Sequence, residues 1–170
     1  MLHVITGGSG SGKSEYAEHC ILDLEGKHRI YIATMYPFDE ESHARIRRHR
    51  EMRKEKEFVT IECYTNLQTL EFSQNADVLL ECMSNLAANE MYQENGAGHR
   101  TVEHILEGID KIKAQVRNLL IVTNEVFSDG ITYDKETETY LKYLGEINVA
   151  LGKRADQVTE VLYGIPIGVK

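Results

Sequence analysis

The stretch "LHVITGGSGSGKSEYAEHCILDL", Leu2 to Leu24, joins three kinds of sequence in a fixed order. An apolar run typical of a buried strand leads into the glycine-rich "GGSGSGKS" of residues 7–14, and a helix-like segment follows. The middle segment fits the pattern G-x-x-x-x-G-K-[ST], which binds phosphate when it lies between a strand and a helix. Because both flanking elements are in place, the stretch predicts a phosphate-binding loop, or P-loop.

The residue types of this loop suit a nucleoside triphosphate. Glycines let the backbone curl so that successive N–H groups point at phosphate oxygens, and the start of the next helix adds partial positive charge. Lys13 is then expected to contact the β- and γ-phosphates, and the Ser14 hydroxyl is expected to bind Mg²⁺. Lys13 is therefore a candidate catalytic residue and Ser14 a candidate metal ligand.

The remainder of the chain alternates strand-like and helix-like segments. Strands are expected at residues 2–6, 29–34, 58–63, 77–83, 118–126 and 156–164, and helices at 13–25, 40–56, 84–94, 101–117 and 135–154. Several strands are continuously apolar, which is typical of strands covered by helices on both faces. The order predicts a P-loop NTPase-like, three-layer α/β fold with a mostly parallel central sheet, in a single domain spanning residues 1–170.

A P-loop site also needs an acidic residue at the end of a neighbouring strand, to hold the metal ion or its water shell. Two glutamates are candidates: Glu81 ends the run "DVLLE", and Glu125 follows the run "NLLIVTN". An unbroken apolar run leads directly into Glu81, so we favour Glu81 as the second Mg²⁺ ligand.

A strongly basic segment lies at residues 45–56, where seven lysines and arginines outnumber two glutamates. On a helix beginning after a capping Asp39, His49 stands on one face between Arg45 and Arg53. Such a helix is a solvated charged face, an RNA-contacting surface, or part of a triphosphate site in which His49 is an acid, a base or a nucleophile. The P-loop favours the third interpretation, because nearby arginines keep an imidazole neutral and stabilise charge on phosphates.

Composition narrows the classes of partner. The 170-residue chain has a formal net charge of -8 and a pI of about 5.4, which disfavours non-specific binding to nucleic acid. The apolar runs are too short to span a bilayer and the N-terminus has no signal-peptide pattern, so no membrane association and a cytoplasmic location are expected.

Five motifs occur in a fixed order: "ITGGSGSGKSEYAE", "YIAT", "RIRRHREMR" with the following "TIE", "LLEC" with "SNL", and "VTNEVFSDGI". In order and spacing they resemble the bifunctional adenosylcobinamide kinase / adenosylcobinamide-phosphate guanylyltransferase family of cobalamin biosynthesis. The C-terminal "LGEINVALGKRADQVTEVLYGIPI" also resembles that family's last helix and strand. The resemblance therefore spans nearly the whole chain.

The resemblance implies two reactions. A nucleoside triphosphate, ATP or GTP, phosphorylates adenosylcobinamide, and GMP is then transferred from GTP to the new phosphate through a guanylyl-histidine at the position of His49. The implied partners are these nucleotides with Mg²⁺, a corrinoid substrate and two further copies of the chain in a homotrimer. The implied nucleotide-binding residues are Gly7, Gly8, Ser9, Gly10, Ser11, Gly12, Lys13, Ser14, Ala33, Thr34, Met35, Arg50, Glu51, Met52, Arg53, Glu62 and Glu81.

One segment departs from the family pattern. The loop of residues 127–133 is one residue longer than the family's and lacks its proline, and no site residue is assigned from it. Two other functions are compatible with the sequence: a P-loop small-molecule kinase without nucleotidyl transfer, and a non-catalytic binding module controlled by its nucleotide.

Overall fold

A computed structural model describes residues 1–54, 56–127 and 130–170, and the side chains of Arg45, His49, Met52 and Arg53 lie outside the described residues. The strands are β1 (Leu2–Thr6), β2 (His28–Ala33), β3 (Val59–Glu62), β4 (Ala76–Glu81), β5 (Asn118–Val122), β6 (Gln157–Leu162) and β7 (Ile165–Gly168). The α-helices are α1 (Lys13–Leu22), α2 (Glu40–Arg53), α3 (Met83–Tyr92), α4 (Thr101–Gln115) and α5 (Lys135–Arg154), with short 3₁₀ turns η1 (Leu67–Thr69) and η2 (Gly98–Arg100).

The strands form one seven-stranded sheet in the order β3-β2-β4-β5-β1-β6-β7. Neighbouring strands are parallel, except that β7 pairs with β6 in the antiparallel sense. The loop after β1 therefore shares one edge of the sheet with the loops that follow β2, β3, β4 and β5. Ligands of open α/β sheets bind at this carboxyl edge.

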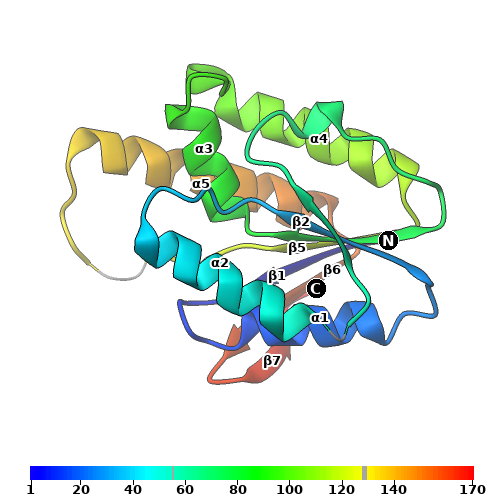
Figure 1. Cartoon of the computed structure of the whole chain (residues 1–170). Helices are drawn as coiled ribbons and strands as arrows, with labels where there is room; N and C mark the ends of the chain where they lie inside the picture. Colours follow the sequence, from blue (N-terminus) through cyan, green and yellow to red (C-terminus); the bar gives the residue numbers. More distant parts are fainter. Residues whose placement is uncertain (55, 128–129) are drawn as a thin grey trace.

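Helices cover both faces of the sheet (Figure 1). Ala17 and Ile21 of α1 pack on one face against a core that includes Ile5, Leu79 and Leu120. On the opposite face α3, α4 and α5 enclose the larger core, with residues such as Leu86, Ile109 and Leu144. Side chains of each buried strand alternate between the two cores, which explains why these strands read as unbroken apolar runs. The predicted three-layer α/β fold with a mostly parallel sheet is confirmed.

One row of side chains across the carboxyl edge of the sheet shows which face the two glutamates of the site point to. Residues paired in register across a sheet point to the same face. Ile5, Val122, Glu81, Ala33 and Glu62 form such a row at the carboxyl edge. Ile5 and Val122 belong to the core beneath α1, so Glu81 and Glu62 also face the side on which α1 lies.

Each predicted strand and helix is present, with ends shifted by a few residues. Two of the predicted strands, residues 77–83 and 118–126, were too long. The observed strands β4 and β5 end at Glu81 and Val122, because the chain leaves the sheet there at its carboxyl edge. Strand β7 was not predicted. It has only four residues, "IPIG", and it forms through a hairpin with β6, which its own composition does not indicate.

Helix α2 is capped at its start and is joined to the rest of the domain by ion pairs near its C-terminal end. The predicted cap is confirmed, since the Asp39 carboxylate accepts a hydrogen bond of 2.7 Å from the Ser42 N–H. Among the side chains of α2 that the structure describes, none is fully buried. Arg50 forms an ion pair with Glu62, the last residue of β3, and Lys56, just past the helix, pairs with Glu18 of α1. In the described ranges, no helix is long and apolar enough to span a membrane.

Candidate nucleotide-binding site

The glycine-rich loop connects β1 to α1 as the sequence predicts. Gly12 immediately precedes the helix with a left-handed backbone (φ 93°), and the Ser11 N–H donates to the carbonyl of Gly8 at 3.2 Å. The Lys13 ammonium curls back and donates to the same carbonyl at 3.0 Å. Lys13 is only 8% exposed. Burial lowers the pKa of Lys13, while Cys82 and Glu81 favour its charged form.

The hairpin of β6 and β7 supports this loop from the other side. The Gly164 N–H in the hairpin turn donates to the carbonyl of Ser11 at 2.8 Å. Gly7 has a φ of +155°, and a Cβ atom added there would lie 2.5 Å from the carbonyl oxygen of Val161. The loop is therefore held by a close backbone contact that admits only glycine at position 7.

Gly7→Ala is expected to lower the free energy of unfolding by about 2–4 kcal/mol, because the methyl group forces the loop away from β6 in an unfavourable backbone conformation. Gly8→Ala is the matched control, since a Cβ there meets no described atom within 4 Å and should cost less than about 1 kcal/mol. Urea denaturation followed by circular dichroism measures both. Equal losses for the two variants would contradict the proposed contact.

Glu81 closes the second side of the site. The Ser14 hydroxyl donates to one oxygen of the Glu81 carboxylate at 2.5 Å, and the Tyr31 hydroxyl donates to the other at 2.8 Å. Glu125, the competing candidate, instead accepts a hydrogen bond from the Phe127 N–H in its own loop at 2.9 Å. A serine hydroxyl beside a carboxylate is a set of oxygen donors that suits Mg²⁺ together with phosphate oxygens and water. The geometry thus favours Ser14 and Glu81 as the pair that would hold the ion.

Tyr31 orients Glu81 from within the sheet. The phenol is 3% exposed and fixes the carboxylate oxygen that Ser14 does not contact. Tyr31→Phe is expected to raise the dissociation constant for Mg²⁺ in the presence of nucleotide about tenfold, as loss of outer-shell partners commonly does. Tyr143→Phe is the control, because that hydroxyl bonds the His99 carbonyl on another part of the molecule. An unchanged Mg²⁺ dissociation constant in Tyr31→Phe would show that the hydrogen bond has no such role.

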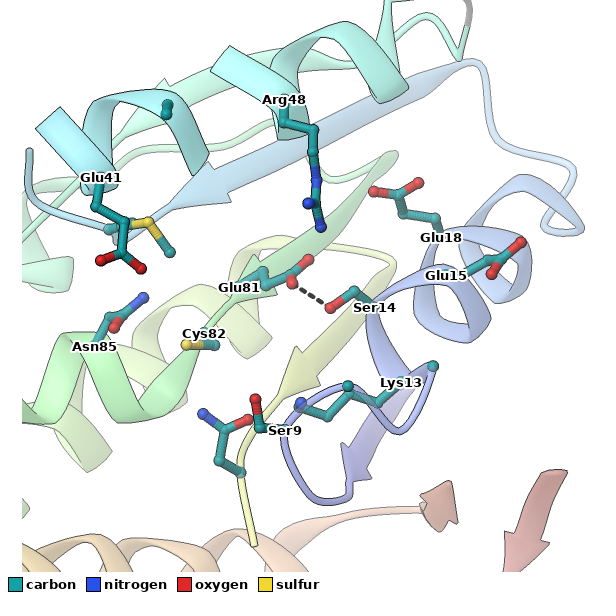
Figure 2. Close-up of a pocket in the computed structure, with 15 residues that line it drawn as sticks. Ser9, Lys13, Ser14, Glu15, Glu18, Glu41, Arg48, Glu81, Cys82 and Asn85 are labelled. Atoms are coloured by element: carbon teal, nitrogen blue, oxygen red, sulfur yellow. Dashed lines mark hydrogen bonds between the residues drawn. The ribbon is translucent and has the colours of Figure 1, made fainter. Parts of the chain in front are cut away.

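Lys13, Ser14 and Glu81 line a pocket of about 720 Å³, a volume typical of small-molecule sites. Figure 2 shows Lys13, Ser14 and Glu81 on its floor and wall and Arg48 of α2 pointing into it from above. The other lining residues are Ser9, Gly10, Gly12, Glu15, Glu18, Met35, Glu41, Ala44, Cys82, Asn85 and Asn124. The P-loop and the basic helix α2 therefore share one pocket.

A smaller pocket of about 60 Å³ adjoins the first and shares Met35, Glu81, Cys82 and Asn85 with it. Its other walls are Tyr31, Ala33, Ile46, Arg50, Glu62 and Tyr64. Glu62 is held on two sides, by the ion pair with Arg50 and by a hydrogen bond of 2.9 Å from the Tyr64 hydroxyl. The residues named by the "YIAT" and "TIE" motifs thus meet beside the P-loop pocket.

Most of the sequence-predicted residues that the structure describes line the two pockets. The described residues that line neither pocket are Gly7, Gly8 and Ser11 of the P-loop, Thr34 and Glu51. Thr34 is buried, and its hydroxyl donates to the Cys82 carbonyl and accepts from the Cys82 N–H, so it fixes the loop after β2. Glu51 lies toward solvent beside Lys54. Of the other predictions, the side chains of His49, Met52 and Arg53 and the loop residues 128 and 129 lie outside the described residues.

Sequence reasoning missed several pocket residues. Tyr31 shows the clearest signal, because it lies two residues before Ala33 on the strand next to Glu81, and alternate strand residues share a face. Asn85 and Asn124 follow β4 and β5 at the carboxyl edge. Polar residues just beyond the ends of parallel strands are the pattern that would have found them.

A P-loop between β1 and α1, a carboxylate from another parallel strand and a three-layer sheet define a P-loop nucleotide-binding α/β protein. The family described as "Cobinamide kinase / cobinamide phosphate guanyltransferase" matches residues 3–169, and the chain belongs to it. This family membership makes the protein a transferase of cobalamin biosynthesis, as the resemblance predicted.

Named relatives agree with the family over full length. The chain is 28% identical to the bifunctional adenosylcobalamin biosynthesis protein CobU of Salmonella typhimurium and 29% identical to that of Escherichia coli, with complete coverage of both chains in each case. It is 26% identical to the bifunctional CobP of Pseudomonas aeruginosa, covering 98% of that protein. Among solved structures, the flagellar accessory protein FlaH of Methanocaldococcus jannaschii has a similar fold, with a TM-score of 0.53 and 12% identity over 99% of this chain and 77% of FlaH.

Proposed function

We propose that the protein phosphorylates adenosylcobinamide with a nucleoside triphosphate and then transfers GMP from GTP to the product, giving adenosylcobinamide-GDP. One observation carries the proposal: Lys13, the Ser14 and Glu81 pair, and Arg48 of the basic helix line a single pocket. A cradle for phosphates thus lies directly below the helix whose residue 49 is a histidine. Family membership supports both activities.

In the kinase step Lys13 and the N–H groups of the loop hold the β- and γ-phosphates, and Arg48 approaches the same phosphates from the opposite wall. Ser14 and Glu81 would hold Mg²⁺, which neutralises charge on the phosphate oxygens when bound. The substrate hydroxyl then attacks the γ-phosphorus and releases its proton to water, and the bond to the bridging oxygen breaks, so that the nucleoside diphosphate leaves with the electron pair. Positioning and charge stabilisation by these residues account for the step.

In the nucleotidyl step a ring nitrogen of His49 attacks the α-phosphorus of GTP. A P–N bond forms, the bond to the bridging oxygen breaks, and pyrophosphate leaves with the electron pair. An oxygen of the cobinamide phosphate then attacks the same phosphorus and the imidazole leaves. Residue 49 lies between Arg48 and Arg50, which line the two adjoining pockets. Since α2 buries none of its described side chains, the helix can shift toward the nucleotide with little loss of apolar contact.

Further features belong to the same proposal. The phosphate donor of the first step is ATP or GTP with Mg²⁺, the enzyme acts in the cytoplasm, and the chain assembles as a homotrimer. These stay predictions that the family resemblance supports, and sedimentation equilibrium tests the last.

Labelled nucleotides test the two reactions separately. With adenosylcobinamide present, label from the γ-phosphate should pass to the corrinoid, and label from the α-phosphate of GTP should then pass to adenosylcobinamide phosphate. Transfer from the γ-position alone would reduce the function to a small-molecule kinase. Slow hydrolysis with no effect of corrinoid would indicate a nucleotide-controlled binding module and overturn the proposal.

A further inference from the structure

Three aromatic side chains form a cluster beside the pocket, here called the aromatic patch. The rings of Tyr36 and Phe38 lie 4.8 Å apart, and those of Tyr36 and Tyr64 lie 5.0 Å apart in an edge-to-face arrangement. Phe38 is 72% exposed and Tyr36 is 38% exposed. Aromatic rings that pack together and stay exposed to water beside a binding pocket are a feature that marks a ligand surface.

The strand order places this patch on the side of Glu81 that lies away from the P-loop. Tyr36 and Phe38 follow β2, and Tyr64 follows β3, whereas the P-loop follows β1 and Glu81 ends β4. In the order β3-β2-β4-β5-β1, Glu81 therefore lies between the P-loop and the patch. With strands spaced by about 4.8 Å, a molecule resting on the patch would reach across β2 to a γ-phosphate held near Glu81.

The patch adjoins the smaller pocket directly through Tyr64 and the larger pocket through the neighbouring residue Met35. Tyr64 lines the smaller pocket together with Met35, the residue that precedes Tyr36, and Met35 lines the larger pocket as well. The Tyr64 hydroxyl bonds Glu62, which pairs with Arg50 of α2. A ligand on the patch would thus lie beside the Ser14 and Glu81 pair and beside α2, the helix that carries His49.

Size and polarity identify the occupant. The pocket of about 720 Å³ is the size for one nucleotide-scale ligand, so a triphosphate leaves no room in it for a corrinoid ring. The second substrate must therefore lie at the pocket border with only its reacting arm inside. A broad corrin macrocycle with methylated edges matches exposed aromatic rings, whereas a phosphate or sugar does not.

We propose that Tyr36, Phe38 and Tyr64 bind the corrin macrocycle of the acceptor substrate, so that its hydroxyl, and later its phosphate, extends into the pocket between Glu81 and α2. This inference rests on the proposed function and adds the site for its second substrate. One fixed position of the corrinoid then serves both reactions, because the patch adjoins the γ-phosphate site and α2 alike.

Equilibrium dialysis with cobinamide, detected by its visible absorbance, tests the patch on the full chain. Phe38→Ala is expected to raise the dissociation constant for cobinamide about tenfold, since truncating an exposed aromatic ring that contacts a ligand commonly has an effect of that size. Phe38→Trp should restore binding. Tyr163→Ala is the matched control, because Tyr163 is 97% exposed on the β6–β7 turn across the sheet, and its variant should bind cobinamide like the wild type.

Three further measurements separate the explanations. Phe38→Ala should leave the affinity for nucleotide and the sedimentation mass unchanged. A change in mass with unchanged cobinamide binding would identify the patch as a contact between copies of the chain and overturn the inference. Weakened nucleotide binding would overturn it as well, because the rings would then bind a purine base. If the wild type transfers phosphate to the corrinoid and Phe38→Ala has the same corrinoid KM, the inference fails while the proposed function stands. A wild type that binds no cobinamide would overturn both.

Discussion

His49→Ala is expected to abolish the covalent nucleotide adduct while the protein continues to phosphorylate adenosylcobinamide. The two reactions need different chemistry, because phosphoryl transfer relies on positioning and charge, whereas transfer of GMP through the enzyme needs a nucleophilic nitrogen. The wild type incubated with GTP labelled at the α-phosphate should retain label after denaturation. A phosphoramidate predicts that this label is labile in acid and stable in alkali.

The matched control lies on the same helix. His43 is exposed near the start of α2, and His43→Ala should keep both the adduct and the kinase reaction. If His49→Ala retains the adduct, or if active wild type forms none, the guanylyl-histidine at this position is excluded. Loss of both reactions in a folded His49→Ala variant would instead make the histidine a general part of the phosphate site.

Lys13→Ala is expected to slow phosphoryl transfer about 10³-fold, corresponding to roughly 4 kcal/mol of transition-state stabilisation. The Lys13 ammonium is buried in the loop and donates to the Gly8 carbonyl. The described residues of α1 and the P-loop include no second lysine or arginine that could replace its charge. Because nucleotide should still meet the loop N–H groups, the loss should appear mainly in kcat. Steady-state kinetics with saturating Mg²⁺ measures the effect.

Lys27→Ala is the control for Lys13→Ala. Lys27 is an exposed lysine in the loop before β2, so the substitution removes the same charge at a distant position. Its kinetics should match those of the wild type. Denaturation curves for both variants check that each is folded. A Lys13 variant that is folded and keeps more than about a tenth of the wild-type kcat would contradict the assigned role.

Local patterns were sufficient for much of the molecule. The P-loop is eight consecutive residues between a strand and a helix, so its presence could be predicted from adjacent residues, whereas its contacts with the β6–β7 hairpin could not. The role of Asp39 could also be predicted from adjacent residues, because its carboxylate caps a helix amide only three residues away. Family motifs extended this prediction to the residues of β2, β3 and β4 that surround the pockets.

Tertiary structure decided what sequence spacing does not encode. Glu81 ends the buried strand β4 and Glu125 follows the buried strand β5, but of the two only Glu81 lies in the row that faces α1, and it bonds Ser14, 67 positions away. Tyr31 joins that pair because β2 and β4 are neighbours in register. The aromatic patch exists because β3 pairs with β2, which brings Tyr64 to Tyr36. Strand order and register come from burial of the whole sheet between two helical layers, a long-range effect that no short stretch of sequence contains.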